Sequence, residues 1–189
     1  MHGKPDMRGN SCGSESHKKR EHRTICSSAS LHPAFPYYSF DSSLFIFLYL
    51  IMLKIAVIDG QGGGIGSLMV KRLKEEFADA VEVIALGTNA AATTAMMKSR
   101  ANKGATGENA IIWNADKVDM LIGPLSIAFP NAMLGEVTEK MATAIIASPA
   151  QKLLLPLNQE GIEIAGINRE PLPHLIEHVI SKIKENGHV

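Results

Sequence analysis

Five of the seven residues from Gly60 to Gly66 are glycine, and this segment constrains the fold more than any other part of the chain. It follows Leu53–Asp59, a nearly continuous apolar run that is typical of a strand buried on both faces of a parallel sheet. It precedes residues 65–78, where apolar side chains recur at the spacing of an amphipathic helix. A buried strand, a tight glycine turn and a helix together predict the first unit of an α/β domain.

Alternating strand and helix patterns continue along the chain. We expect strands at residues 81–86 and 118–122, a glycine loop at residues 102–109, and helices at residues 89–101, near Trp113, at 138–148 and at about 171–185. Residues 152–157 and 162–167 flank a turn at residues 158–161, so we expect a hairpin at a sheet edge. The fold class that follows is α/β, a three-layer Rossmann-like sandwich with a mostly parallel sheet of about five strands. Strand orders 3-2-1 and 2-1-3 both stay open.

Residues 1–51 differ in composition from the expected domain, residues 52–189. Both cysteines and all three tyrosines of the chain lie in this leader. Its apolar run at residues 44–53 is about half as long as a membrane-spanning helix. The run passes directly into the first strand, so cleavage there as a signal peptide would destroy the domain. We expect either that Met52 is the true start and the leader is a mis-called extension, or that the leader is a disordered tail.

The charge of the domain restricts its partners. From Met52 onward the chain carries 13 Lys+Arg and 15 Asp+Glu, with no Cys and no Tyr. This near-neutral balance argues against nucleic acid as a partner. The lack of cysteine excludes a disulfide framework and a cysteine zinc site. We expect a cytoplasmic protein with no membrane partner, and leave open whether it forms a homo-oligomer.

The spacing of the glycines can be compared with that of known nucleotide-binding loops. The pattern Gly60-x-x-x-Gly64-x-Gly66 is similar to the loop of short-chain dehydrogenases. Their catalytic Tyr-x-x-x-Lys cannot exist in a domain without tyrosine, so hydride transfer of that type is excluded. No lysine stands between Gly66 and Ser67, which argues against the phosphate loop of ATPases. NAD(P) and a mononucleotide both remain open as ligands, and a turn without any ligand is the alternative.

Several motifs together resemble one family. They are Lys54-Ile-Ala-Val-Ile-Asp-Gly-Gln-Gly-Gly-Gly-Ile-Gly66, Leu86-Gly-Thr-Asn89, Gly104-Ala-Thr-Gly-Glu-Asn-Ala-Ile111, Gly123-Pro124 and Met133-Leu-Gly-Glu136. The family consists of small uncharacterised bacterial proteins, known as a domain of unknown function with a Rossmann-like fold. The resemblance runs from Met52 to about Glu185. It implies the fold and supports Met52 as the start, but it implies no activity.

Residues after the strands are the candidates for a ligand site, because ligands bind at the carboxyl ends of strands in open α/β sheets. The expected contacts are Gly60, Gln61, Gly62, Gly63, Gly64, Ile65, Gly66, Thr88, Asn89, Glu108 and Gly123. Asp59 ends the first strand, where its charge would repel a bound phosphate. Individually weaker candidates for the same crevice are Ser126, Asn131, Glu136 and Asn158.

These candidates lead to two functional hypotheses. The first is a ligand-binding or sensor domain that holds a nucleotide or another phosphorylated small molecule at residues 60–67. The second is an enzyme that acts on a nucleotide-type substrate. In that case Glu108, at the expected start of a helix, is the acid/base; otherwise it complements the helix dipole or binds a ribose hydroxyl.

One further motif points to metal chemistry. His174, Glu177 and His178 match an inverted zinc-protease pattern. Apolar residues around them form the buried helix face, which leaves both histidines on the polar face. We therefore expect no metal site.

Overall fold

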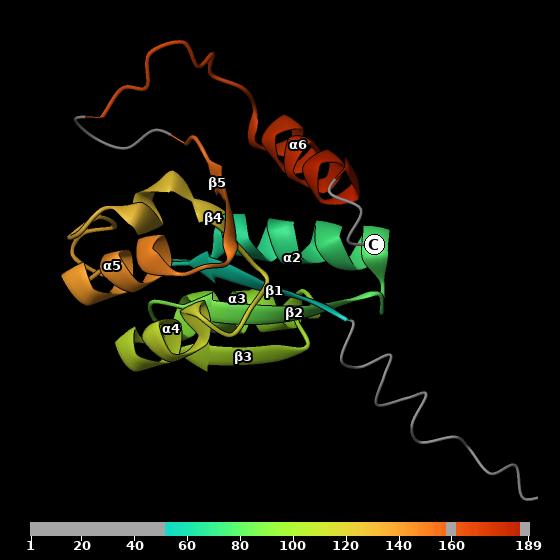
Figure 1. The fold of residues 1–189 in the computed structure, drawn as a ribbon, viewed down its shortest axis with the longest axis horizontal. Helices are drawn as coiled ribbons and strands as arrows, with labels where there is room; N and C mark the ends of the chain where they lie inside the picture. Colours follow the sequence, from blue (N-terminus) through green and yellow to red (C-terminus); the bar gives the residue numbers. More distant parts are fainter. Residues whose placement is uncertain (1–51, 158–161, 186–189) are drawn as a thin grey trace, which may run out of the picture. The chain divides into compact units, whose positions relative to one another are not determined.

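The computed structural model describes residues 52–157 and 162–185 (Figure 1). The strands are β1 (Leu53–Asp59), β2 (Val81–Gly87), β3 (Lys103–Thr106), β4 (Met120–Pro124) and β5 (Gln151–Leu155). The helices are α2 (Gly64–Phe77), α3 (Ala90–Lys98), α4 (Glu108–Ala115), α5 (Glu139–Ala147) and α6 (Leu172–Glu185), with a 3₁₀ turn, η1 (Leu125–Ala128). The leader and the expected turn around Asn158 lie outside the described residues.

The five strands form one sheet in the order β3-β2-β1-β4-β5. This arrangement confirms the α/β, Rossmann-like fold. Of the two strand orders that the sequence left open, it contains 3-2-1. β1 pairs with β2 from Leu53↔Val81 to Asp59↔Gly87 and with β4 on its other side, so it is the central strand. The chain connects to β2 and β3 on one side of β1, then returns to β4 and β5 on the other. The switch in direction therefore falls between β1 and β4.

The prediction of a hairpin at the sheet edge is wrong. β5 runs parallel to β4, with Met120 opposite Gln151 and Pro124 opposite Leu155, so all the strands are parallel. Residues 162–167 form no strand of this sheet. Pro156 follows β5 directly and has no N–H to continue a ladder. Ile162 and Ile164, whose alternation suggested a strand, are exposed rather than packed on a sheet face.

The short edge strand β3 lies where a glycine loop was expected. Its four residues are mostly exposed and carry no apolar pattern, so periodicity gave no signal. Gly104 fits here because α3 packs closely on β3. A Cβ at this position would lie 2.7 Å from Sδ of Met97.

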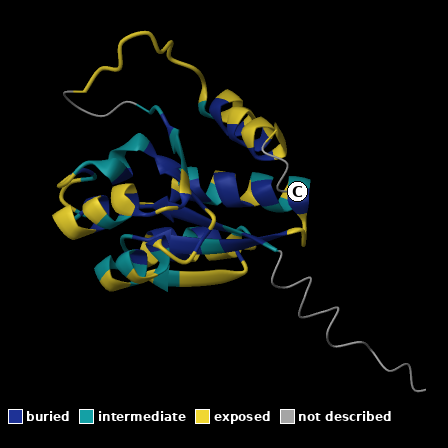
Figure 2. Cartoon of the chain, viewed as in Figure 1, coloured by how far each residue is buried: buried dark blue, intermediate teal, exposed yellow. Residues whose placement is uncertain are grey.

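The sheet separates two apolar cores. Figure 2 shows buried residues along the strands and on the helices that pack against them. One core joins β1 and β2 to α2, α3 and α6. The other joins the opposite face of the sheet to η1, α4 and α5. Two helices have side-chain caps: the Asn89 side chain accepts a hydrogen bond from the Ala92 amide, and the Thr138 hydroxyl accepts one from the Met141 amide. None of the helices in the described part of the chain has both the length and the apolar character needed to cross a membrane.

Candidate functional site

A cleft of about 470 Å³ opens between the carboxyl ends of β1 and β4. Its lining consists of Asp59, residues 60–65 of the glycine loop, Pro124, Ser126, Met133, Leu134 and Leu157. The cleft lies where the strand order changes direction, which is the usual ligand position in open α/β sheets. Its volume is in the range of small-molecule sites. The glycine loop and Ser126 therefore meet in one place.

Asp59 is buried beneath the glycine loop rather than facing the cleft as a free charge. Its Oδ1 accepts a hydrogen bond from the Gly60 amide at 2.8 Å, and its Oδ2 accepts one from the Gly66 amide at 2.6 Å. Burial raises the pKa of Asp59, and the charge of Glu136 adds to this. The amides of Gly66, Gly60 and Ile65 act in the opposite direction. The carboxylate therefore holds both ends of the loop and takes up part of the donor capacity at the start of α2.

Glu136 is the second carboxylate of the loop. Its Oε2 accepts three hydrogen bonds, from the Gln61 amide at 2.8 Å, the Thr88 hydroxyl at 2.5 Å and the Asn89 side-chain amide at 2.8 Å. Partial burial acts to raise the pKa of Glu136, but these hydrogen bonds outweigh it and hold the pKa below its ordinary value. Glu136 thus joins the glycine loop to the residues that follow β2.

Three glycines of the loop are explained by packing. A Cβ at Gly60 would lie 2.5 Å from Sδ of Met133, and one at Gly66 would lie 2.6 Å from Sδ of Met96. Gly63 has φ of +69°, and a Cβ there would lie 2.6 Å from Cα of Ala92. All three glycines are buried: Gly63 lets the loop approach the backbone of α3, and Gly60 and Gly66 leave room for side chains.

Gly62 and Gly64 are different. Both are exposed and line the cleft, and a Cβ at either position would meet no atom within 4 Å. Neither amide donates a hydrogen bond to the described residues. Gly64 is the first residue of α2, where amides point out of the helix without an acceptor. Neither packing nor a positive φ accounts for these two glycines.

The other predicted contacts are distributed around the cleft. Thr88 and Asn89 do not line it but contact Glu136, which stands beside Gln61. Gly123 is buried, and a Cβ there would lie 2.5 Å from the Ile58 carbonyl oxygen. Asn131 is exposed, adopts φ of +62° and also lies outside the lining. Asn158 is outside the described residues.

Glu108 begins α4 and is not among the described residues that line the cleft. Its carboxylate accepts a hydrogen bond from Lys140 at 3.4 Å. The hydrogen bond with the Thr138 hydroxyl is the main cause that lowers the pKa of Glu108; burial opposes it, and the charge and hydrogen bond of Lys140 lower it further. The structure thus brings Glu108 together with α5 rather than with the glycine loop.

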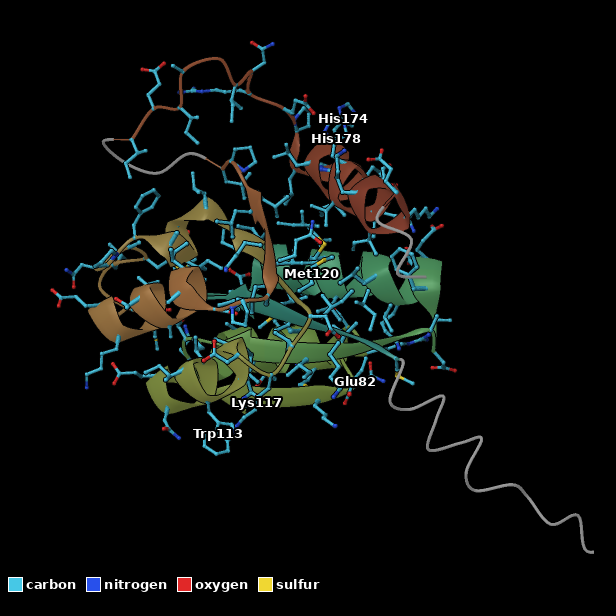
Figure 3. All side chains as sticks on the ribbon, in the orientation of Figure 1. Glu82, Trp113, Lys117, Met120, His174 and His178 are labelled. Carbon is cyan, nitrogen blue, oxygen red and sulfur yellow. The ribbon has the colours of Figure 1, made fainter. Side chains whose placement is uncertain are left out.

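The motif on α6 does not form a metal site. Figure 3 shows His174 and His178 on this helix, and both are exposed. His178 contacts Glu170, with 3.5 Å between Nδ1 and Oε2. Within residues 52–157 and 162–185, no group of three or more potential ligands is placed to hold a metal ion.

Sequence reasoning undervalued Asp59 and Glu136. Asp59 was expected only to repel a phosphate, although a carboxylate directly before a glycine loop can also accept its amides. Glu136 contacts Gln61 across 75 positions of the chain, and no local pattern encodes such a contact. The motif at residues 133–136 was the one sequence feature that singled out Glu136.

Comparison with known proteins gives a family and no activity. No curated protein matches the chain in sequence. Nothing in these comparisons links it to short-chain dehydrogenases, so that likeness is limited to the glycine spacing. A family model described as "Domain of unknown function (DUF3842)" matches residues 54–188, and the chain therefore belongs to this family, in agreement with the resemblance of its motifs.

Proposed function

We propose that this chain binds a nucleotide or another phosphorylated small molecule at residues 60–67, as a ligand-binding or sensor domain. The phosphate lies over Gly62 and Gly64 and accepts hydrogen bonds from their amides. The observation that carries this proposal is the division among the glycines. Packing requires Gly60, Gly63 and Gly66, whereas Gly62 and Gly64 face the cleft with open space above them.

The start of α2 favours an anion at this position. Helix α2 has 14 residues, and the partial positive charge at its first turn attracts negative groups. A side chain at Gly62 or Gly64 would occupy the space where a phosphate approaches the backbone. Glycine at both positions is therefore what a backbone phosphate site requires.

The charge of the cleft limits the kind of phosphate. Neither lysine nor arginine is among the described residues that line it. ATPase loops use a lysine to bind the terminal phosphates, whereas dinucleotide loops bind a pyrophosphate through amides and a helix N-terminus. This comparison favours a mononucleotide or a dinucleotide such as NAD over a nucleoside triphosphate.

The enzyme hypothesis has less support. Glu108 is paired with Lys140 and, unlike Glu136, contacts no residue of the glycine loop, so it is not placed to exchange a proton with a ligand there. The lowered pKa of Glu108 also favours a constant negative charge near neutral pH. Its contacts fit the alternative role, in which a carboxylate complements the dipole of α4.

Ligand binding can be tested directly. Native mass spectrometry of the purified full chain would reveal a co-purified ligand, and calorimetric titration would use AMP, GMP, CMP, UMP and NAD as probes. We expect at least one probe to bind, and Gly64→Val to abolish that binding. The variant should fold, because no atom lies within 4 Å of the new Cβ.

Ser181→Val is the matched control, since it places the same side chain at an exposed position of α6, away from the cleft. Circular dichroism would verify that both variants are folded. Unchanged affinity in folded Gly64→Val, or no binding of any probe by the wild-type chain, would contradict the proposal.

A further inference from the structure

The end of β2 lacks the acidic residue that nucleotide-binding domains of this type use. In Rossmann domains a carboxylate there accepts hydrogen bonds from a ribose hydroxyl. Here β2 ends at Gly87 and continues into Thr88 and Asn89, so the chain itself has no acid at this point.

Glu136 supplies a carboxylate to the same position from a different part of the chain. It comes from the segment between η1 and α5, and it contacts both Thr88 and Asn89 at the end of β2. It also accepts the amide of Gln61 in the glycine loop. A single carboxylate therefore lies between the loop that is proposed to hold the phosphate and the strand end where a sugar is expected.

The two oxygens of Glu136 differ in their contacts. All three hydrogen bonds end on Oε2, while Oε1 accepts none from the described residues. The side chain is half-buried and stands beside Gln61 at the edge of the cleft, outside the described residues that line it, and Oε1 is not fully enclosed. The hydrogen bonds on Oε2 keep the pKa of Glu136 low, so the group is an ionised acceptor near neutral pH. Orientation by three donors also fixes the side chain before a ligand arrives.

The segment that carries Glu136 is shaped for this contact. Met133, Leu134 and Gly135 all have positive φ, between 56° and 87°, and so turn the chain sharply before Glu136. Met133 and Leu134 line the cleft themselves. Gly60 leaves the space for Glu136, because a Cβ there would lie 2.8 Å from Oε2.

We propose that Glu136 is the sugar-binding carboxylate of this site, and that its Oε1 accepts a hydrogen bond from a ribose hydroxyl of the ligand. The proposal rests on the phosphate site at Gly62 and Gly64. It adds a specificity: the chain selects ribonucleotides with a free 2′,3′-diol over 2′-deoxynucleotides. It also rejects a 2′-phosphate, since Asp59 and Glu136 are both acidic and no described lining residue is a lysine or arginine that would pair with the extra charge.

The test compares pairs of probes that differ at one atom or group. AMP is titrated against 2′-deoxy-AMP, and NAD against NADP, with the wild-type chain, Glu136→Gln and Glu139→Gln. Glu139 is the matched control, because it is an exposed glutamate three residues further along at the start of α5. For the wild type we expect a preference of about tenfold or more for AMP over 2′-deoxy-AMP and for NAD over NADP. Glu136→Gln should reduce both preferences to within about threefold, and Glu139→Gln should preserve them.

The ratio of affinities separates this role from a structural one. If Glu136 only held the loops in place, Glu136→Gln would weaken both members of a pair equally and leave the ratio unchanged. That result, or equal binding of AMP and 2′-deoxy-AMP by the wild type, would overturn the proposal. If Gly64→Val still abolished binding in that case, the phosphate site would stand without it. Failure of the wild type to bind any of these four probes, or GMP, CMP or UMP, would overturn both.

Discussion

Replacing Gly63 and Gly64 by alanine should change the stability of the domain in opposite directions, although the two residues are adjacent. At Gly63 a left-handed conformation with φ of +69° costs an alanine about 1–2 kcal/mol. The new Cβ would also lie 2.6 Å from Cα and 2.8 Å from the carbonyl oxygen of Ala92. These are backbone atoms of α3, so the helix itself has to shift, and overpacking of this kind costs about 1–3 kcal/mol. The expected loss is about 2–5 kcal/mol.

At Gly64 neither penalty applies. No atom lies within 4 Å of an added Cβ, and the residue is the first of α2. Alanine restricts the unfolded chain more than glycine does, which stabilises the folded state by about 0.4–1 kcal/mol. For a domain of this size, 1 kcal/mol corresponds to roughly 3–5 °C in Tm. Gly63→Ala should therefore lower Tm by about 6 °C or more, and Gly64→Ala should leave it unchanged or raise it by a few degrees.

Differential scanning calorimetry of the full chain would measure both variants. Gly62→Ala is the control, since its surroundings are as open as those of Gly64 and it should behave alike. Equal losses of Tm in all three variants would refute the division between packed and open glycines. The same result would remove the basis for a phosphate site at Gly62 and Gly64.

Two further predictions concern ionisable groups. Burial raises the pKa of Asp59 above 3.8, so the ionised carboxylate lowers the free energy of unfolding progressively as the pH rises from about 3.8 through the folded-state pKa. Asp59→Asn loses one acceptor for the loop amides at every pH, and asparagine does not titrate. Because only the wild type loses stability as the pH rises, the difference in unfolding free energy between the variant and the wild type should be largest at acidic pH and smaller near neutral pH. A constant difference in urea unfolding between pH 4 and 8 would contradict this. Glu177→Gln removes an ion pair between α6 and α2, in which Arg72 donates hydrogen bonds of 2.5 and 3.0 Å to the Glu177 carboxylate. Because the Glu177 side chain is half exposed, the loss of Tm should be small and should shrink in 1 M NaCl; a loss insensitive to salt would argue against an ionic contribution.

The first strand, the glycine loop and α2 were predictable because three independent signals coincide within about 25 residues. β1 is apolar throughout, the turn is rich in glycine, and α2 has a clear apolar stripe. Such local signals encode the type of each element. The caps Asn89 and Thr138 were predictable for the same reason, since a cap acts within its own helical turn.

The sheet edges were not predictable in this way. β3 buries little surface, so its residues need no alternation of apolar and polar side chains. Residues 162–167 do show such an alternation, yet only Ile162 forms an isolated bridge and the segment adds no strand to the sheet. Edge pairing depends on what the neighbouring strand offers, and Pro156 interrupts the chain between β5 and that segment.

The position of the cleft was predictable, but its internal arrangement was not. The glycine loop marks the end of β1, and ligands bind at that edge of the sheet. The five glycines look alike in sequence, whereas their neighbours in space divide them into packed and open ones. Those neighbours come from α3 and from the segment around Met133, which only the folded chain brings near.

Helix α6 has a consequence for how the domain is assembled during synthesis. It contributes Leu175, Ile176, Val179, Ile180 and Ile183 to the core on the α2 face of the sheet. The ribosome delivers this helix after every strand, through a connection at residues 162–171 that is itself almost entirely exposed. Until α6 docks, the nascent chain presents an uncovered apolar face on a completed sheet, and exposed surface of this kind is prone to aggregation. Folding of this half of the domain therefore finishes only after translation of α6.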